Sequence, residues 1–473
     1  MDEGKLDPVN YNQKRVIRLK EIGKSLNEVS PSMCLAKWLQ STITLYNGYT
    51  HSCHHPSPHK ITDEDLLNPT GIHNTATKIE AREQMLNGER PRECGYCWNI
   101  EDLGKDFISD RTYKSADNWA WPNLDVVLKS KLGENINPTY MEVAFDSTCN
   151  LKCTYCSPEV SSRWMEEIEH HGPYKLMNNY TMYDLNYSRQ TKRIPIHKDD
   201  YNPYVEAFWN WWPELYPTLD TFRITGGEPL LSKHTWKVLE YVLEHPRDDL
   251  TIAINTNLCV PQKLIQKLVD YANKLQGKIK EFQIYTSCEA SGEQAEFIRF
   301  GMDYGQFQEN CKYVLENTPS AVRLSFMVTT NLLSAPSFMD FLDFIYNLRC
   351  TYNEEDSHNR TPMMIAYVRW PEFLNINNLT DDLKHKYAAE WTKYVTDRNR
   401  TNSHHKAGRF YLEEIDQVQR LCEFMMTENS NVILNRQNFV LYYQQYEKNR
   451  GLNVAEVFPE LSDFIRQCEL EFR

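Results

Sequence analysis

The chain has 473 residues, of which 41% are hydrophobic and 25% are charged, with only 17 Gly and 22 Pro, so disordered, collagen-like and low-complexity classes are excluded. The net charge of −13 and the absence of a long Lys/Arg block make nucleic acid an unfavourable partner. No apolar run approaches eighteen residues, and the acidic N-terminus carries no targeting signal, so we expect a cytoplasmic protein without a membrane segment.

The first third of the chain is predicted to hold an arm and a small module. Residues 1–30 show no strong apolar period and are interpreted as a polar N-terminal arm. Residues 31–110 are rich in Cys, His, Gly, Pro and Asn, with a helical patch at Thr77–Leu86. We expect a loop-rich module that a metal or cluster stabilises in place of a core of its own.

From about residue 139, short β-branched and aromatic runs alternate with amphipathic stretches, which is typical of βα units. Six strands are predicted, at Met141–Asp146, Thr221–Thr225, Leu250–Asn255, Glu281–Ser287, Val322–Thr329 and Met363–Val368. Helices are predicted at Lys233–Glu244, Gln262–Leu275, Tyr304–Glu316 and Ser337–Leu348. The fold class is therefore α/β, a partial (β/α)6 TIM-like barrel over 139–370, with an insertion at 157–220 and a helical C-terminal region at 371–473.

The predicted strands alternate apolar and polar side chains. If helices cover the apolar faces, the polar faces line a cavity that can take a ligand; the residues are Glu142, Asp146, Arg223, Asn255, Gln283, Tyr285, Arg323 and Ser325. A half-exposed antiparallel sheet gives the same alternation and is the less favoured alternative. For the two arginines, a buried ion pair with Glu142 or Asp146 is favoured over contact with an anionic substrate.

Three cysteines follow the first predicted strand at close spacing: Cys149, Cys153 and Cys156. Thiolates at this spacing can bind three irons of a [4Fe-4S] cluster and leave the fourth iron open. A structural zinc ion needs a fourth ligand, and no neighbouring His or Cys supplies one. Six later cysteines are isolated, and we interpret them as buried apolar side chains.

This CxxxCxxC run resembles the cluster motif of the radical S-adenosylmethionine (SAM) enzymes. The similarity extends to Gly226, Gly227 and Glu228, which resemble the GGEP segment of that family. The resemblance implies that the backbone of this segment and the Glu228 carboxylate hold the amino group of SAM. Two glycines permit close approach of the backbone to a ligand, and a carboxylate pairs with an ammonium group.

Further segments resemble the SAM-binding positions of the same family. The resemblance assigns to them the following residues: Tyr155 beside adenine, Asn257 in the segment after the third strand, Ser287 and Glu289 near the ribose, and Arg299 on the SAM carboxylate. Many relatives have Asp where this chain has Glu289.

A second set of cysteines, Cys34, Cys53, Cys94 and Cys97, lies in the loop-rich module. Four thiolates suit either a zinc ion, with His54 or His55 as replacements, or a second [4Fe-4S] cluster, and the residues alone leave this open. The surrounding segments resemble the twitch or SPASM-type auxiliary-cluster modules of radical SAM proteins. In most relatives that module follows the barrel, whereas here it precedes it.

The resemblance implies reductive cleavage of SAM to methionine and a 5′-deoxyadenosyl radical, with a reduced flavodoxin- or ferredoxin-type protein as the electron donor. Relatives with auxiliary modules often modify peptides, so we expect a peptide or small protein substrate. A polar small metabolite or sugar is the alternative. A non-catalytic zinc-binding scaffold is the alternative from another class.

Overall fold

The computed structural model describes residues 8–104, 107–130, 135–177, 180–353, 359–399 and 406–472. Helices and strands alternate through this part of the chain, which confirms the α/β class. The chain divides into two compact units. The first comprises residues 1–145, 199–224 and 249–251, and the second comprises residues 146–198, 225–248 and 252–473. The domain boundaries drawn from the sequence, and the closure of the strands into a partial barrel, stay predictions.

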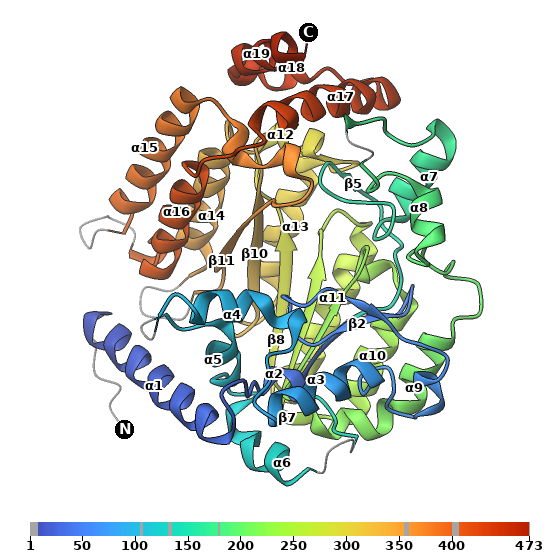
Figure 1. Ribbon diagram of the computed structural model, residues 1–473. Coiled ribbons are helices and arrows are strands. Elements are labelled where there is room, and N and C mark those ends of the chain that lie inside the picture. Colours follow the sequence, from blue (N-terminus) through green and yellow to red (C-terminus); the bar gives the residue numbers. More distant parts are fainter. Residues whose placement is uncertain are drawn as a thin grey trace. The chain divides into compact units, whose positions relative to one another are not determined.

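Most of the stretch interpreted as a polar arm is a helix, α1 (Pro8–Val29) (Figure 1). Residues 1–7 of that arm lie outside the described residues. Leu19, Ile22 and Leu26 recur at spacings of three and four, and each is at most 5% exposed. This apolar stripe is narrow among many polar side chains, which is why the sequence pattern did not reveal the helix.

The sheet of the first unit contains short strands that the sequence analysis missed. Strand β1 (Gln40–Thr44) pairs in parallel with β4 (Tyr140–Ala144) and antiparallel with β2 (Tyr49–His51). Strand β2 also pairs with β3 (His59–Lys60), and β4 is flanked on its other side by β6 (Thr221–Thr225). β1 to β3 are two to five residues long and carry mostly polar side chains, so they lack the alternation by which the longer strands were recognised.

The loop-rich module of the first unit has an apolar core, contrary to our expectation. Met33, Leu35 and Trp38 are at most 4% exposed and pack in one cluster with residues of α1 and with several cysteines. Its described helices, together with one from the predicted insertion, are α2 (Ala36–Leu39), α3 (Ala76–Leu86), α4 (Gly95–Glu101), α5 (Asp110–Ser115), α6 (Leu124–Lys129) and α9 (Pro203–Leu215). Apolar residues scattered through short elements formed a core that no periodic pattern indicated.

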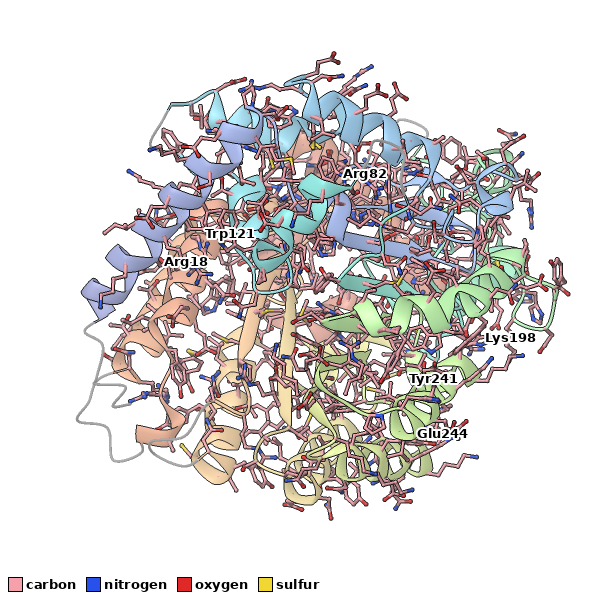
Figure 2. All side chains as sticks on the ribbon, turned by 90° about the horizontal axis from the view of Figure 1, so that it is seen from below. Arg18, Arg82, Trp121, Lys198, Tyr241 and Glu244 are labelled. Atoms are coloured by element: carbon pink, nitrogen blue, oxygen red, sulfur yellow. The ribbon has the colours of Figure 1, made fainter. Side chains whose placement is uncertain are left out.

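Hydrogen bonds from arginine side chains connect these short elements in the first unit. Arg82 of α3 is buried and donates hydrogen bonds to the Lys37 carbonyl oxygen and to the Asn74 side chain, at 3.1 and 2.7 Å (Figure 2). Arg18 of α1, labelled in the same figure, donates to the Ala116 carbonyl oxygen at 3.4 Å.

The second unit contains the longer predicted strands, in the order β11-β10-β8-β7. They are β7 (Arg247–Thr256, of which residues 249–251 group with the first unit), β8 (Ile279–Ser287), β10 (Arg323–Thr330) and β11 (Met363–Tyr367). β10 pairs in parallel with both β8 and β11. With β4 and β6, all six predicted strands are present.

The predicted helices between these strands are also confirmed (Figure 1): α10 (Lys233–Glu244), α11 (Gln262–Leu275), α13 (Tyr304–Asn317) and α14 (Phe338–Tyr352). The first two match the predicted bounds residue for residue. Their apolar stripes recur at three- and four-residue spacing and are buried, so the period alone was sufficient to place them.

The strand faces follow the predicted alternation, and the arginines form ion pairs. Arg223 lies 3.8 Å from the Glu142 carboxylate, as favoured from the sequence. Arg323, however, pairs with Glu281 at 3.3 Å. Because Arg323 is opposite Gln283 in the β8–β10 register, Glu281 is its neighbour on the same face two residues away.

The predicted insertion contributes α7 (Ser162–His171) and α8 (Leu185–Gln190) to the second unit. A small antiparallel pair joins β5 (Lys152–Cys153) to β9 (Arg299–Phe300), which follows α12 (Gly292–Ile298). The C-terminal region is helical as predicted: α15 (Asp381–Asp397), α16 (Leu412–Met425), α17 (Val432–Arg450), α18 (Val454–Val457) and α19 (Ser462–Phe472). Within the described residues, no helix is long and apolar enough to cross a membrane.

We expect Arg349→Met to destabilise the second unit by about 3–5 kcal/mol, because it leaves the buried Glu414 carboxylate without its counter-charge. Arg349 of α14 is fully buried and binds both carboxylate oxygens of Glu414 in α16, at 2.6 and 2.9 Å. Urea denaturation measures the loss. As a control, Arg163→Gln removes an exposed pair with Glu166 and should cost less than about 1 kcal/mol. Equal losses in the two variants would contradict this assignment.

Candidate functional site

The loop with the three closely spaced cysteines follows β4 in the chain and belongs to the second unit. Its middle cysteine, Cys153, lies in β5 and is opposite Arg299 of β9. The next peptide group continues the pairing, since the Thr154 amide donates to the Ile298 carbonyl oxygen at 2.8 Å. Backbone pairing therefore fixes the centre of the loop, between Cys149 and Cys156.

Burial is the main influence on the three thiols of this loop. It raises the pKa of Cys149 to about 12 and raises the pKa values of Cys153 and Cys156. Repulsion from Cys153 adds to the rise at Cys149 and Cys156, whereas the Arg299 charge lowers the pKa of Cys153. Thiolates at such positions need a compensating cation. A bound iron cluster supplies that charge and displaces the protons, so the donor chemistry of this loop fits the predicted group.

The described residues contain no group of three or more His, Cys, Asp or Glu side chains close enough to hold a single metal ion. The three thiolates expected on a cubane cluster bind different irons, so they stand farther apart than ligands of one ion.

The GGEP segment packs directly against the cysteine loop. The Gly227 amide donates to the Asp146 carbonyl oxygen at 3.3 Å, and the Glu228 amide donates to the Thr148 oxygen at 2.7 Å. A Cβ atom on Gly227 would lie 2.3 Å from that Thr148 oxygen, which no side chain tolerates. Gly226 has φ of +129°, a backbone region that favours glycine. The close approach therefore requires glycine at Gly227, and the backbone conformation favours glycine at Gly226.

The Glu228 carboxylate connects the GGEP segment to the loop after β7. It is 1% exposed and accepts hydrogen bonds from the Leu230 amide at 3.0 Å and from the Asn257 amide at 2.7 Å. The Asn257 side chain in turn donates to Asn150 of the cysteine loop at 2.9 Å. Each carboxylate oxygen retains acceptor capacity for the ammonium group that the resemblance predicts there. Burial raises the pKa of Glu228 to about 7.

Three residues predicted to contact different parts of SAM lie together. The Arg299 guanidinium forms a buried ion pair with Glu289, at 2.5 Å through Nη2 and 3.1 Å through Nε. The Tyr155 hydroxyl lies 3.2 and 3.3 Å from the two Glu289 oxygens. Arg299 Nη1 lies 3.8 Å from the Cys153 sulfur. A carboxylate ligand at Arg299 must therefore share the guanidinium with Glu289, which the sequence did not indicate.

Ser287, the remaining predicted SAM-binding residue, is the last residue of β8 and is partly exposed. It lies two residues before Glu289 in the chain. The predicted role of Ser287 near a ribose stays a prediction.

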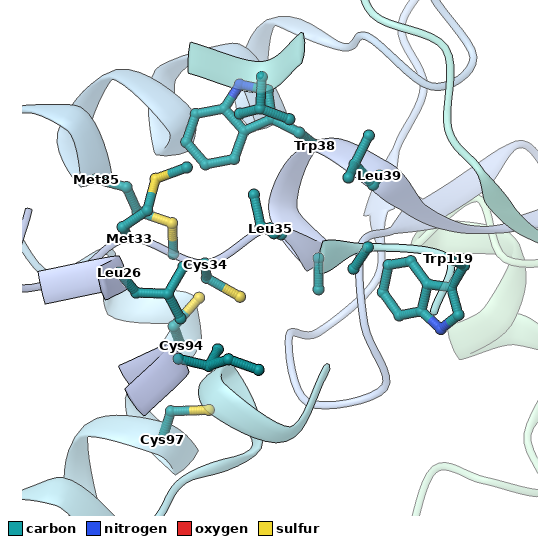
Figure 3. Close-up of a cluster of buried hydrophobic side chains, with 14 of the residues drawn as sticks. Leu26, Met33, Cys34, Leu35, Trp38, Leu39, Met85, Cys94, Cys97 and Trp119 are labelled. Carbon is teal, nitrogen blue, oxygen red and sulfur yellow. The ribbon is translucent and has the colours of Figure 1, made fainter. Parts of the chain in front are cut away.

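The second set of cysteines lies in the first unit and lines one cavity. Cys34, Cys94 and Cys97 are buried in the hydrophobic cluster of the module (Figure 3). Cys53 is partly buried and packs against this cluster. Burial raises the pKa of Cys94 and of Cys97 to about 12.

Three basic side chains line the same cavity: Lys37, Arg111 and Lys114. Lys37 and Arg111 hold down the pKa of Cys34, which burial raises. Lys37 also pairs with Glu93, and Arg111 pairs with Glu101 at 2.8 Å. Four thiolates around either a zinc ion or a [4Fe-4S] cluster carry net negative charge, which nearby cations stabilise. The chemistry of the donor set therefore suits both groups that the sequence left open, although in the described part of the chain these side chains do not lie close enough together to hold a single ion. No sequence pattern indicated these cations.

Comparison with known proteins gives a short region of sequence similarity. No protein-family model matches the chain. A stretch of 123 residues is 28% identical to GTP 3′,8-cyclase from Syntrophomonas wolfei subsp. wolfei. That stretch is 26% of this chain and 27% of the relative, so the chain spans about a quarter of the length of the protein it matches. The match supports membership of the radical SAM superfamily.

Two solved structures of Streptococcus suis SuiB were also matched, one bound to S-adenosylmethionine and one to the precursor peptide SuiA. Both are 14% identical to this chain with a TM-score of 0.32, and they cover 78% and 77% of it, and 71% and 70% of SuiB. A superposition at this score carries no argument about the fold or site of this chain.

A third group of residues lies at the cysteine loop and was not predicted from the sequence: Tyr442, Tyr446 and Arg450 of α17. The Tyr442 hydroxyl donates to the Thr154 carbonyl oxygen at 2.7 Å, nearly 290 residues away in the chain. Their spacing of four residues places all three on one face of a helix. The spacing could have indicated a shared helix face from the sequence, although it could not show which residues that face contacts.

We expect the free energy of unfolding to depend on the ionisation of Glu228. Because its folded pKa of about 7 lies above its ordinary 4.5, the stability it contributes is present below pH 4.5 and is lost as the pH rises to about 7. Glu228→Gln should remove this dependence. The measurement is the difference in unfolding free energy between the wild type and the variant at about pH 5 and about pH 8. A difference that does not change with pH would mean that the carboxyl is not perturbed.

Proposed function

We propose that this chain is a radical SAM enzyme that reductively cleaves SAM and modifies a peptide or protein substrate. The observation that carries the proposal is the contact between the CxxxCxxC loop and the GGEP segment. Motifs separated by about 70 residues meet in one unit, through two backbone hydrogen bonds and a glycine that admits no side chain. The sequence similarity to GTP 3′,8-cyclase supports the same superfamily.

Cys149, Cys153 and Cys156 would hold a [4Fe-4S] cluster with one open iron. When bound, the cluster supplies the electron that splits SAM into methionine and a 5′-deoxyadenosyl radical, which takes a hydrogen atom from the substrate. The chain's own residues bind and orient SAM: the Glu228 carboxylate accepts from the ammonium group, and Arg299 donates to the carboxylate group. Tyr155, Asn257, Ser287 and Glu289 complete the proposed pocket. A reduced flavodoxin- or ferredoxin-type protein is the proposed electron donor.

The second cysteine set is proposed to hold an auxiliary [4Fe-4S] cluster. Cys34, Cys53, Cys94 and Cys97 would saturate it, so it would relay electrons or order the module and not bind substrate directly. The resemblance to twitch and SPASM-type modules supports a cluster over zinc, and it also supports a peptide substrate, since relatives with such modules often modify peptides.

A polar small molecule is the second candidate substrate. The observation that favours it is the sequence similarity itself, because that relative is named for a reaction of GTP. Incubation of the reduced protein with labelled SAM and either a peptide library or nucleotides separates the two. Substrate-dependent release of 5′-deoxyadenosine identifies the class.

We expect Cys153→Ala to remove about four irons with their sulfide and to abolish 5′-deoxyadenosine formation, because a cluster cannot be held by two thiolates of the loop. Iron, sulfide and 5′-deoxyadenosine are measured after anaerobic reconstitution. Cys422→Ala is the control, since this buried cysteine lies in α16, outside both sets. Zinc without sulfide in the wild type would instead favour the non-catalytic scaffold.

Cys97→Ala tests the auxiliary site separately. We expect it to remove about four irons while the spectrum of the SAM-cleaving cluster persists, because the two sets lie in different units. Unchanged iron together with loss of zinc would assign the second set to zinc.

A further inference from the structure

The face of α17 formed by Tyr442, Tyr446 and Arg450 contacts the cysteine loop and has no role in the function proposed above. Both tyrosine rings are at most 1% exposed. The Tyr446 hydroxyl donates to the Phe297 carbonyl oxygen at 2.7 Å and lies 3.5 Å from the Lys152 carbonyl oxygen. Phe297 directly precedes Ile298, whose carbonyl accepts from the loop.

The outward-facing carbonyl groups of the loop are held by side chains. The Ser161 hydroxyl donates to the Leu151 oxygen at 3.1 Å, and the Trp164 indole donates to the Cys153 oxygen at 2.8 Å. The Thr154 oxygen accepts from two hydroxyls, that of Tyr442 at 2.7 Å and that of Tyr183 at 3.2 Å. The loop also pairs with β9, beside which the Thr154 amide donates to the Ile298 carbonyl oxygen.

A buried ion pair anchors the last turn of α17 to the same place. Arg450 donates to both Glu167 oxygens at 3.0 Å, and the Lys152 ammonium of the cysteine loop donates to this carboxylate at 2.5 Å. The Arg450 guanidinium also lies 3.5 Å from the centre of the Tyr446 ring and 4.6 Å from that of Trp164. Although burial raises the pKa of Glu167, the Arg450 charge holds it below its ordinary value. Glu167 therefore joins the loop, α7 and α17.

These contacts bear directly on the geometry of the thiols. A loop of eight residues must present three thiolates to three irons, and each peptide that rotates moves a sulfur. Ordering a flexible backbone costs about 1–2 kcal/mol of free energy per residue. If the loop were not already ordered, this free energy would be subtracted from that of cluster binding. Carbonyls locked against buried donors cannot rotate without losing those bonds.

We propose that α17 is a positioning element for the iron-sulfur site, in which Tyr442 and Tyr446 hold the cysteine loop in the conformation that binds the cluster. The inference rests on the proposed function, since it assumes that the loop binds a cluster. Neither tyrosine contacts the reacting atoms; both are positioning residues that act through the backbone on either side of Cys153. The Thr154 carbonyl accepts the shortest of the hydrogen bonds from α17 to the loop.

The test uses the two hydroxyls that share the Thr154 carbonyl. Tyr442→Phe and Tyr183→Phe each leave one donor, so iron loss to a chelator should remain within about twofold of the wild-type rate. The double variant leaves the carbonyl without a donor, and its cluster should be lost about tenfold faster, equivalent to about 1.4 kcal/mol. Its reduced-state paramagnetic resonance lines should also broaden, because the thiols adopt a range of positions.

The matched control is Tyr443→Phe, on the same helix, whose hydroxyl donates to Glu469 and not to the loop. It should lose iron at the wild-type rate. Thermal unfolding of the metal-free proteins separates a general loss of stability from a specific loss of cluster binding. The positioning role is overturned if the double variant keeps its cluster and spectrum, or if the control loses iron equally fast. If the wild type binds no iron and sulfide, the proposed function fails together with this inference.

Discussion

Buried peptide groups need hydrogen-bond partners, and this constraint governs the cysteine loop. A loop that presents three thiols inside a protein cannot also pair all its carbonyls as a strand does. Here one edge pairs with β9, and the other is satisfied by side chains from α7 and α17. Because an unpaired buried carbonyl costs about 1–3 kcal/mol, the site depends on residues nearly 290 positions away. Helix α17 therefore contributes hydrogen-bond donors to the cysteine loop.

The second unit also buries charged side chains near the cysteine loop, and each needs a partner that stabilises its charge. Glu289 and Arg299 neutralise each other, and Tyr155 adds a hydrogen bond to the carboxylate. Among the described residues no cation hydrogen-bonds to Glu228, whose carboxylate accepts instead from the Leu230 and Asn257 amides and from the Thr256 side chain. The two carboxylates therefore differ in their partners. Glu228 has capacity for a positively charged ligand group, whereas Glu289 is already paired, and a ligand carboxylate at Arg299 has to compete with it.

Much of the fold was predictable because it follows local periods. All six predicted strands and the helices between them were found, since their apolar residues recur at regular spacing and are buried as a face. The elements that were not predicted lack a regular pattern: α1 buries only a narrow apolar stripe, and β1 to β3 are short and polar. The meeting of the CxxxCxxC and GGEP segments was expected from the resemblance. The Arg299–Glu289 pair and the contacts of Tyr442 were not, because hydrogen bonds between distant segments leave no local pattern.

The two cysteine sets hold their thiols in different ways. The first set lies in a loop whose backbone is fixed on both edges by hydrogen bonds. The second lies within an apolar cluster built from short helices and loops, with Lys37 and Arg111 beside the sulfurs. Hydrogen bonds are directional and so fix the orientation of the backbone that carries the thiols. Apolar packing mainly fixes the volume available around the thiols and excludes water from it. The first arrangement therefore suits a site that must leave one metal position open to a ligand, and the second suits a group that its four thiolates enclose.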